Sequence, residues 1–117
     1  MTEDDTIRVR HMLEAASEAM AFAKGRTRRD LDTDRMFALA LMKSIEIIGE
    51  AATKVSRPVQ AQHPDIPWAD IVGMRNRLIH VYFSINHDVL WQTVSGDLPR
   101  LVQQLDRALA EKQGNGK

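Results

Sequence analysis

The chain has 117 residues, no cysteine, and 16 basic against 16 acidic residues, so its formal charge is zero. This length allows one domain that buries roughly two-thirds of its unfolded surface, and 44% hydrophobic residues is an ordinary value for a globular protein. The lack of cysteine excludes disulfide frameworks, thiolate zinc sites and cysteine nucleophiles. The neutral balance excludes a global positive field for nucleic acid. The acidic N-terminus and the short apolar stretches predict a cytoplasmic protein without secretory signal or membrane span.

Helical periodicity extends over nearly the whole chain, and no segment alternates in the way that a half-buried strand does. Thr2 and the acidic residues after it predict the start of a first helix, and Gly25 predicts its end. Residues 25–34 then form a polar connector that carries three arginines.

A second helix is predicted from Asp32–Asp34 to about Ser56, where Pro58 ends it. It is apolar along two rows at helical spacing. The first row is Phe37, Leu41, Ile45, Ile48, Ala52 and Val55, and the second is Met36, Ala40, Ile47 and Ala51. A helix that is apolar on two sides must be covered on both. A second copy of the chain is one way to cover the side that the other helices leave open.

Residues 57–67 hold three prolines and predict an irregular connection with a short turn at 59–62. A third helix is predicted from Pro67, and a fourth from the cap at Asn86, in one piece with a kink at Pro99. Residues 111–117 are predicted to form a flexible tail. The expected fold is therefore all-α: one domain over residues 1–110, built as an antiparallel bundle of four to five helices.

The third helix ends in a cluster of polar side chains, which are Arg75, Asn76, Arg77, His80 and Tyr82. On an ideal helix Asn76 and His80 share one face, whereas Arg75 and His80 diverge by about 140°. Arg75 and His80 would meet if the helix distorts after Ile79, or if a second subunit completes a groove between them.

These groups suit the cleavage of a phosphodiester without a metal ion. An imidazole can take a proton from a ribose 2′-hydroxyl or give one to the leaving 5′-oxygen, and a guanidinium can bind the phosphate oxygens. The same residue types also cap helices and form ion pairs, so a structural role stays open. Two interpretations also remain for Arg26, Arg28 and Arg29, which could form a phosphate-binding patch or belong to an ordinary solvated loop. The four histidines show no metal-ligand spacing, which predicts no metal site.

Four landmarks follow one another along the chain: Ile48-Gly-Glu50-Ala-Ala, His63-Pro-Asp-Ile-Pro-Trp68, Gly73-Met-Arg75-Asn76-Arg-Leu-Ile-His80-Val-Tyr82, and Val89-Leu-Trp91 ahead of Asp97-Leu-Pro99. Together they resemble the HepT-like branch of the HEPN proteins, over about residues 5–110. An arginine five residues before a histidine is frequent by chance. The tyrosine after it and the Gly-Glu and Pro-Trp landmarks before it make the resemblance specific.

The resemblance implies a homodimeric, HEPN-like bundle that cleaves RNA, transfer RNA being one option, without a metal ion or other cofactor. Such a protein is the toxin of a type VII toxin–antitoxin pair, whose partner is a minimal nucleotidyltransferase antitoxin. Matched by motif position, Arg75 and His80 would be catalytic, and Asn76, Arg77 and Glu50 would support them.

In the same family the motif tyrosine, here Tyr82, is where the partner attaches AMP to silence the toxin. Arg26, Arg28 and Arg29 would add to the RNA-binding surface. Two rival interpretations remain. One is a catalytically idle helical dimer that binds a nucleotidyltransferase or a nucleotide, and the other is a purely structural bundle. For Glu50, a role in helix packing or capping is an equal alternative.

Overall fold

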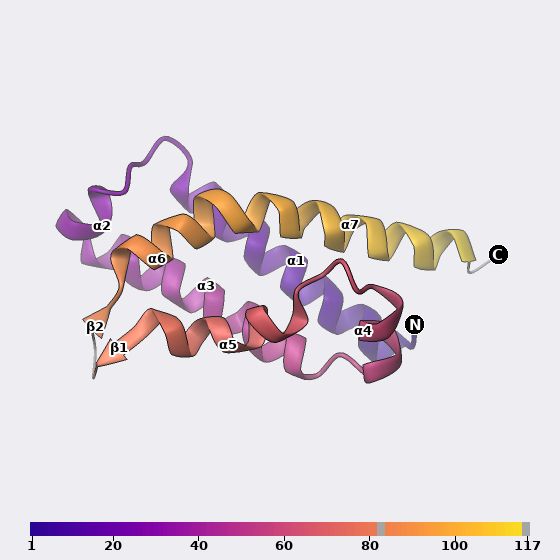
Figure 1. Ribbon diagram of the computed structural model, residues 1–117. Helices are drawn as coiled ribbons and strands as arrows, with labels where there is room; N and C mark the ends of the chain where they lie inside the picture. The colour runs from indigo at the N-terminus through magenta and orange to yellow at the C-terminus, as the bar shows by residue number, and fades with distance from the viewer. Residues whose placement is uncertain (82–83, 116–117) are drawn as a thin grey trace.

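The computed structural model describes residues 1–81 and 84–115, and for Arg75, 79–81, 84 and 112–115 it describes the backbone alone. Four long helices lie side by side and alternate in direction, in an elongated bundle of 50 × 28 × 20 Å (Figure 1). The elements are α1 (Glu3–Ala23), α2 (Asp30–Thr33), α3 (Arg35–Thr53), α4 (Arg57–Gln62), α5 (Trp68–Leu78), β1 (Ile79–Val81), β2 (Ser84–Ile85), α6 (His87–Gln92), the π-helical turn η1 (Thr93–Asp97) and α7 (Leu98–Asn115). The predicted all-α antiparallel bundle is confirmed.

The first two long helices begin at the capping residues that the sequence predicts. The Thr2 hydroxyl accepts a hydrogen bond from the Asp5 N–H at 3.1 Å at the start of α1. Gly25 follows the end of α1 with φ of +76°, a conformation that glycine adopts without strain. The Asp34 carboxylate accepts a hydrogen bond from the Phe37 N–H at 3.1 Å and so caps α3.

α3 ends slightly before the predicted boundary at Ser56. The segment after it holds a short helix, α4, with Pro58 in its first turn, where a proline costs no hydrogen bond. The Ser56 N–H and hydroxyl donate to the two carboxylate oxygens of Asp5, each at 2.8 Å. Asp5 therefore joins the beginning of α1 to the beginning of α4.

The two apolar rows of α3 have different surroundings. Every side chain of the first row is buried, and α3 as a whole packs mainly against α1 and α5. In the second row, Met36 is 82% exposed and Ile47 37% exposed, while Ala51 is buried. The backbones of α3 and α5 come close at Gly49, where an added Cβ would lie 3.3 Å from the Ile71 carbonyl oxygen.

The chain from His87 to Asn115 is helical without a break, as the sequence predicts. Asn86 caps it by accepting a hydrogen bond from the Val89 N–H at 3.1 Å. Where the sequence predicts a kink at Pro99, the structure has the π-helical turn η1, which ends two residues before this proline. A proline has no N–H with which to continue the hydrogen bonds of the preceding turn. The backbone of α7 continues to Asn115, into the segment predicted as a tail, and residues 116–117 lie outside the described residues.

The third helix is shorter than the sequence predicts. α5 ends at Leu78, and β1 follows and pairs antiparallel with β2 in the register Ile79↔Ile85 and Val81↔Ser84. The prediction of helix through Ile79 and of no strand is therefore wrong for this segment. Residues 79–85 are rich in β-branched and aromatic side chains, which favour strands, and the pairing of β1 with β2 adds to this preference against the helical spacing.

Candidate functional site

The polar cluster around the end of α5 lies on two kinds of backbone. Arg75, Asn76 and Arg77 belong to the last part of α5, whereas His80 belongs to β1. The helical separation of about 140° between Arg75 and His80 does not apply, because the helix ends between them. The side chains of Arg75 and His80, and all of Tyr82, lie outside the described residues.

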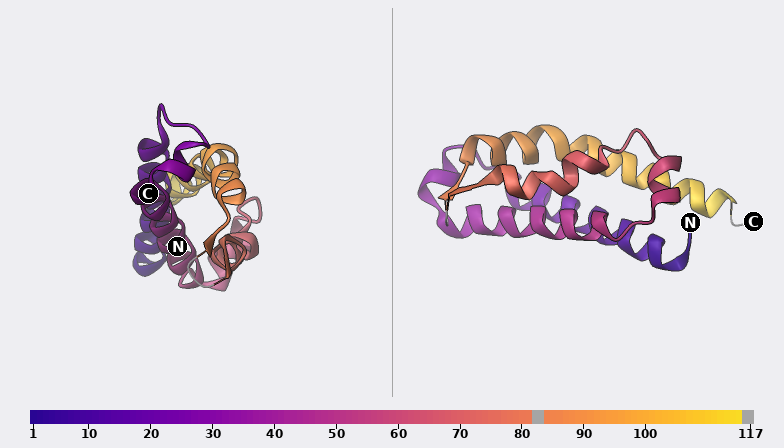
Figure 2. Two further views of the ribbon diagram at one scale, coloured as in Figure 1. Left: turned by 90° about the vertical axis from the view of Figure 1, so that its left-hand side faces the viewer. Right: turned by 60° about the horizontal axis from the view of Figure 1, so that its bottom comes forward.

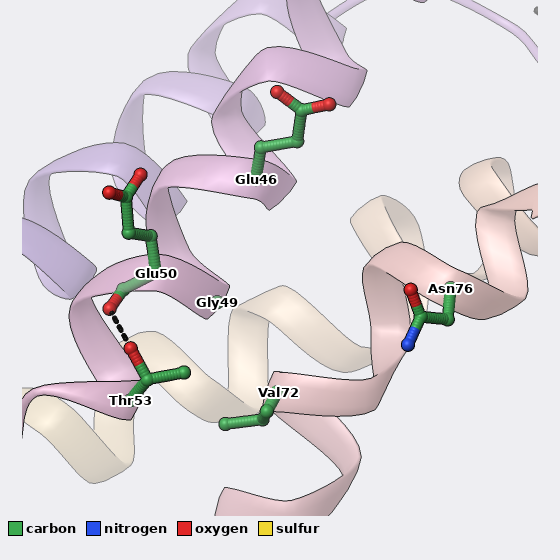
Figure 3. Close-up of a pocket in the computed structure, with 6 residues that line it drawn as sticks. All are labelled: Glu46, Gly49, Glu50, Thr53, Val72 and Asn76. Carbon is green, nitrogen blue, oxygen red and sulfur yellow. Dashed lines mark hydrogen bonds between the residues drawn. The ribbon is translucent and has the colours of Figure 1, made fainter.

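A pocket of about 510 Å³ lies between α3 and α5, beside this cluster (Figure 3). Its lining residues are Glu46, Gly49, Glu50, Thr53, Val72 and Asn76. The structure thus brings Glu50 and Asn76, two residues singled out in the sequence, to one hollow. Sequence reasoning did not single out the other lining residues, which are Glu46, Gly49, Thr53 and Val72. Glu46 and Thr53 could have been found, because Glu46, Glu50 and Thr53 recur at three- and four-residue steps on one face of α3.

The side chains of the pocket favour hydrogen bonds to neutral or cationic groups. Figure 3 shows the Thr53 and Val72 side chains pointing toward each other across the gap, and the Thr53 hydroxyl donates to the Glu50 carbonyl oxygen at 2.6 Å. Glu46 lies 3.9 Å from the Lys43 ammonium, and Glu50 lies 3.8 Å from the Lys54 ammonium. A carboxylate cannot donate a hydrogen bond to a phosphate, so phosphate binding here depends on nearby cations rather than on Glu46 or Glu50.

Arg77 lies on another side of α5 from Asn76. It lines a second pocket of about 280 Å³, between α5 and α7, together with Asp70 and Arg100. Its guanidinium is 3.7 Å from the Asp70 carboxylate and donates to the Asp70 carbonyl oxygen at 3.3 Å. The structure therefore does not bring Arg77 to the pocket that Glu50 and Asn76 share.

Arg26 already contacts several groups of its own chain. Its guanidinium donates to Asp30 at 3.2 Å and to Asp34 at 3.0 Å, and it lies 4.0 Å from the centre of the Phe37 ring. The pKa of Asp30 is lowered by the Thr27 N–H and then by Arg26, and the pKa of Asp34 by the Phe37 N–H and then by Arg26. A phosphate at Arg26 would have to displace these carboxylates.

Arg28 has two carboxylate partners and Arg29 is exposed. Arg28 donates to Asp32 and to Asp88, each at 2.7 Å. Among the residues whose side chains are described, Arg29 makes no ion pair within the chain. Of the three arginines in the connector, Arg29 is the one that can bind a phosphate without breaking an existing contact.

Two kinds of feature are absent from the described part of the chain. No group of three or more histidine and carboxylate side chains there could hold a metal ion. No helix there combines the length and the apolar composition needed to cross a bilayer.

The fold and the cluster define a small helical-bundle protein with an arginine near the end of one helix and a histidine in the hairpin that follows. The family model described as "Ribonuclease HepT-like" matches residues 12–108, which include the whole segment from Arg75 to Tyr82. The chain belongs to the HepT-like ribonuclease family, and the resemblance seen in its motifs is confirmed.

Named relatives agree with this assignment. The chain is 35% identical to "Probable ribonuclease HepT" of Thermococcus cleftensis, over 81% of this chain and 90% of the relative. It is 32% identical to a "Putative RNase" of Caldanaerobacter subterraneus subsp. tengcongensis, over 88% of this chain and 92% of the relative. A protein of Methanocaldococcus jannaschii that is also named a putative RNase is 33% identical, over 81% of this chain and 87% of the relative. No solved structure matches this chain significantly.

Proposed function

We propose that the chain is an endoribonuclease that cuts RNA with Arg75 and His80 and without a metal ion. The observation that carries the proposal is the family match over residues 12–108, which includes the complete arginine–histidine–tyrosine motif. The ribonuclease names of relatives that align over most of their length support the same activity.

In the proposed reaction His80 takes the proton of a ribose 2′-hydroxyl while the 2′-oxygen attacks phosphorus. The bond between phosphorus and the 5′-oxygen breaks, and the imidazolium returns the proton to that oxygen. The products are a 2′,3′-cyclic phosphate and a 5′-hydroxyl. Arg75 offsets the negative charge that builds up on the phosphate oxygens. Asn76 and Glu50, in the pocket between α3 and α5, support the bound RNA by hydrogen bonds.

RNA also needs cations away from the cleavage point, because the net charge of the chain is zero. We assign phosphate contacts first to Arg29, which is exposed, and to Arg77, whose contact with Asp70 is long at 3.7 Å. Arg26 and Arg28 would bind RNA only at the expense of their carboxylate partners.

The active form is proposed to be a homodimer. Met36, Leu39 and Ile47 on α3 and Val72 on α5 are large apolar side chains with 37–82% exposure. Exposed apolar side chains gathered on neighbouring helices are typical of an interface. Val72 itself lines the pocket, and Ile47 follows the pocket residue Glu46 on α3, so a second copy on this face would lie next to the motif.

The proposed biological setting is a type VII toxin–antitoxin pair. The chain would be the toxin, and a minimal nucleotidyltransferase would silence it by attaching AMP to Tyr82. Support comes from the resemblance of the motif and from the family match, both of which include Tyr82.

The decisive experiment is RNA cleavage in the presence of a chelator. Wild type should cut purified transfer RNA, and Arg75→Ala and His80→Ala should each lose roughly a hundred- to a thousandfold in rate, as expected for an oxyanion-stabilising group or a general acid–base. Arg107→Ala is a charge-matched control on the exposed surface of α7. Undiminished cleavage in both motif variants, or a requirement for added magnesium, contradicts the proposal. Absence of cleavage with intact dimers favours the idle binding module.

A further inference from the structure

Four side chains join the connector after α1 to the first turn of α6. We call this cluster the clasp, and it consists of Arg28, Asp32, His87 and Asp88. Arg28 donates through Nη1 to Asp32 and through Nε to Asp88, both at 2.7 Å. His87 Nδ1 lies 2.8 Å from the second carboxylate oxygen of Asp32. The Arg28–Asp88 and Asp32–His87 contacts connect residues 60 and 55 positions apart, so they arise only from the tertiary structure.

Two members of the clasp, His87 and Asp88, follow almost directly after the hairpin that contains His80. β2 ends at Ile85, and Ile85 pairs with Ile79, the residue before His80. The Asn86 N–H donates to the Leu78 carbonyl oxygen at 2.9 Å and closes the base of the hairpin. Figures 1 and 2 show α2, the two strands and the start of α6 at the same end of the bundle. The strand of His80 is thus continuous with α5 on one side and is linked through β2 to the clasp on the other.

The charges of the clasp support one another although its members are open to solvent. Hydrogen bonds from Arg28 and then from His87 lower the pKa of Asp32, and Asp32 and then Asp88 raise the pKa of Arg28. The side chain of His87 is 28% exposed and that of Asp88 is 82% exposed. Exposed ion pairs add little to global stability. The main effect of such a cluster is therefore on the local position of the elements that it connects.

We propose that the clasp positions the hairpin for catalysis, with Arg28 and Asp88 as positioning residues for His80. This inference rests on the proposed ribonuclease function. A general acid–base must be held within a fraction of an ångström of its reacting atoms, so a small displacement of the hairpin lowers the rate of the chemical step. The affinity for RNA depends on other cations and changes little.

The test compares Arg28→Gln, Asp88→Asn and the double variant in the full-length protein. If the two residues act through their mutual contact, each single variant should lower kcat by roughly tenfold, and the double variant should be no worse than either. KM for transfer RNA should change less than about twofold, and Arg28→Lys should recover part of kcat because it keeps the charge. Arg107→Gln and Asp106→Asn, on the exposed surface of α7, are the charge-matched controls.

Amide hydrogen exchange gives a second measurement that does not require activity. In the clasp variants the amides of residues 79–81 and 84–85 should exchange about tenfold faster, while the melting temperature stays within about 2 °C of wild type. A fall in affinity for RNA confined to Arg28→Gln would make Arg28 an RNA contact and overturn the proposal. Unchanged kcat and unchanged exchange in all three variants would overturn it too. If wild type itself does not cleave RNA, the proposed function fails, and the exchange rates still decide whether the clasp holds the hairpin.

Discussion

Replacing Asp5 by alanine should destabilise the protein more than an ordinary change at the start of a helix. The side chain of Asp5 accepts hydrogen bonds from the Ser56 N–H and the Ser56 hydroxyl at 2.8 Å each, and from the Thr2 hydroxyl at 3.0 Å. The residue is only 4% exposed. Alanine would leave the N–H at the start of α4 without its partner and would cut the link between α1 and α4.

The size of the loss in the free energy of unfolding follows from these contacts. A hydrogen bond to a charged group contributes about 1.5–3 kcal/mol, and water will replace part of the loss near the surface. We therefore expect a decrease of about 2–3 kcal/mol in the free energy of unfolding, which corresponds to roughly 8–12 °C in melting temperature for a chain of this length. Asp4→Ala is the matched control, because Asp4 is exposed in the same helical turn and should lose less than about 1 kcal/mol.

The effect of Asp5 should also depend on pH. Burial raises the pKa of Asp5, but the hydrogen bonds from Ser56 and Thr2 outweigh it and hold the pKa below its ordinary value of 3.8. Because the pKa of Asp5 is lower in the folded state, the contribution of Asp5 to the free energy of unfolding is complete at pH values above the ordinary pKa. It is lost as the pH falls through the pKa of the folded state. Urea unfolding of wild type and Asp5→Ala between pH 3 and 7 measures it. Equal destabilisation by Asp4→Ala and Asp5→Ala, or a difference that grows in acid, would refute the reasoning.

Three further outcomes test the interface, the modification and the helix contact. Light scattering should show the proposed dimer for wild type and a monomer for Met36→Glu, because this change charges the most exposed apolar side chain of α3; a dimer that persists in the variant contradicts the proposed face. Incubation with a minimal nucleotidyltransferase and ATP should add AMP to wild type but not to Tyr82→Phe, as read by mass spectrometry, and an equal adduct in the variant assigns another residue. Gly73→Ala should stabilise by up to about 1 kcal/mol in thermal unfolding, since a Cβ there has no neighbour within 4 Å. Gly49→Ala should stabilise less or destabilise, since its Cβ would lie 3.3 Å from the Ile71 carbonyl oxygen, and equal shifts argue against that close contact.

The helix starts were predictable because a cap is a local structure. Asp34 and Asn86 each accept a hydrogen bond from an N–H three residues later, so a short stretch of sequence holds all the atoms involved. The first apolar row of α3 was equally readable, because a core-facing row repeats with the helical period. Glu50 and Asn76 were singled out as candidates by their landmarks, and the structure adds that they line one pocket.

The hairpin after Leu78 is a segment whose secondary structure could not be predicted from a short stretch of sequence. Helical spacing and strand preference compete over residues 79–85, and the outcome depends on the partner strand and on the Asn86 N–H that reaches the Leu78 carbonyl oxygen. The contacts of Arg28 could not be predicted locally either. Its neighbours in sequence predict an exposed loop, but it donates a hydrogen bond to Asp88, which lies 60 positions away in the sequence.

By itself, the amino-acid sequence determined the all-α class, the order of the long helices and the family, because periodicity, caps and motif spacing are properties of consecutive residues. Only the tertiary structure decided that Asp5 binds Ser56, that Glu50 and Asn76 share a hollow, and that Arg28 and Asp32 contact Asp88 and His87 next to the hairpin. These contacts depend on how helices approach one another, and that is set by side-chain packing across the core rather than by any short segment.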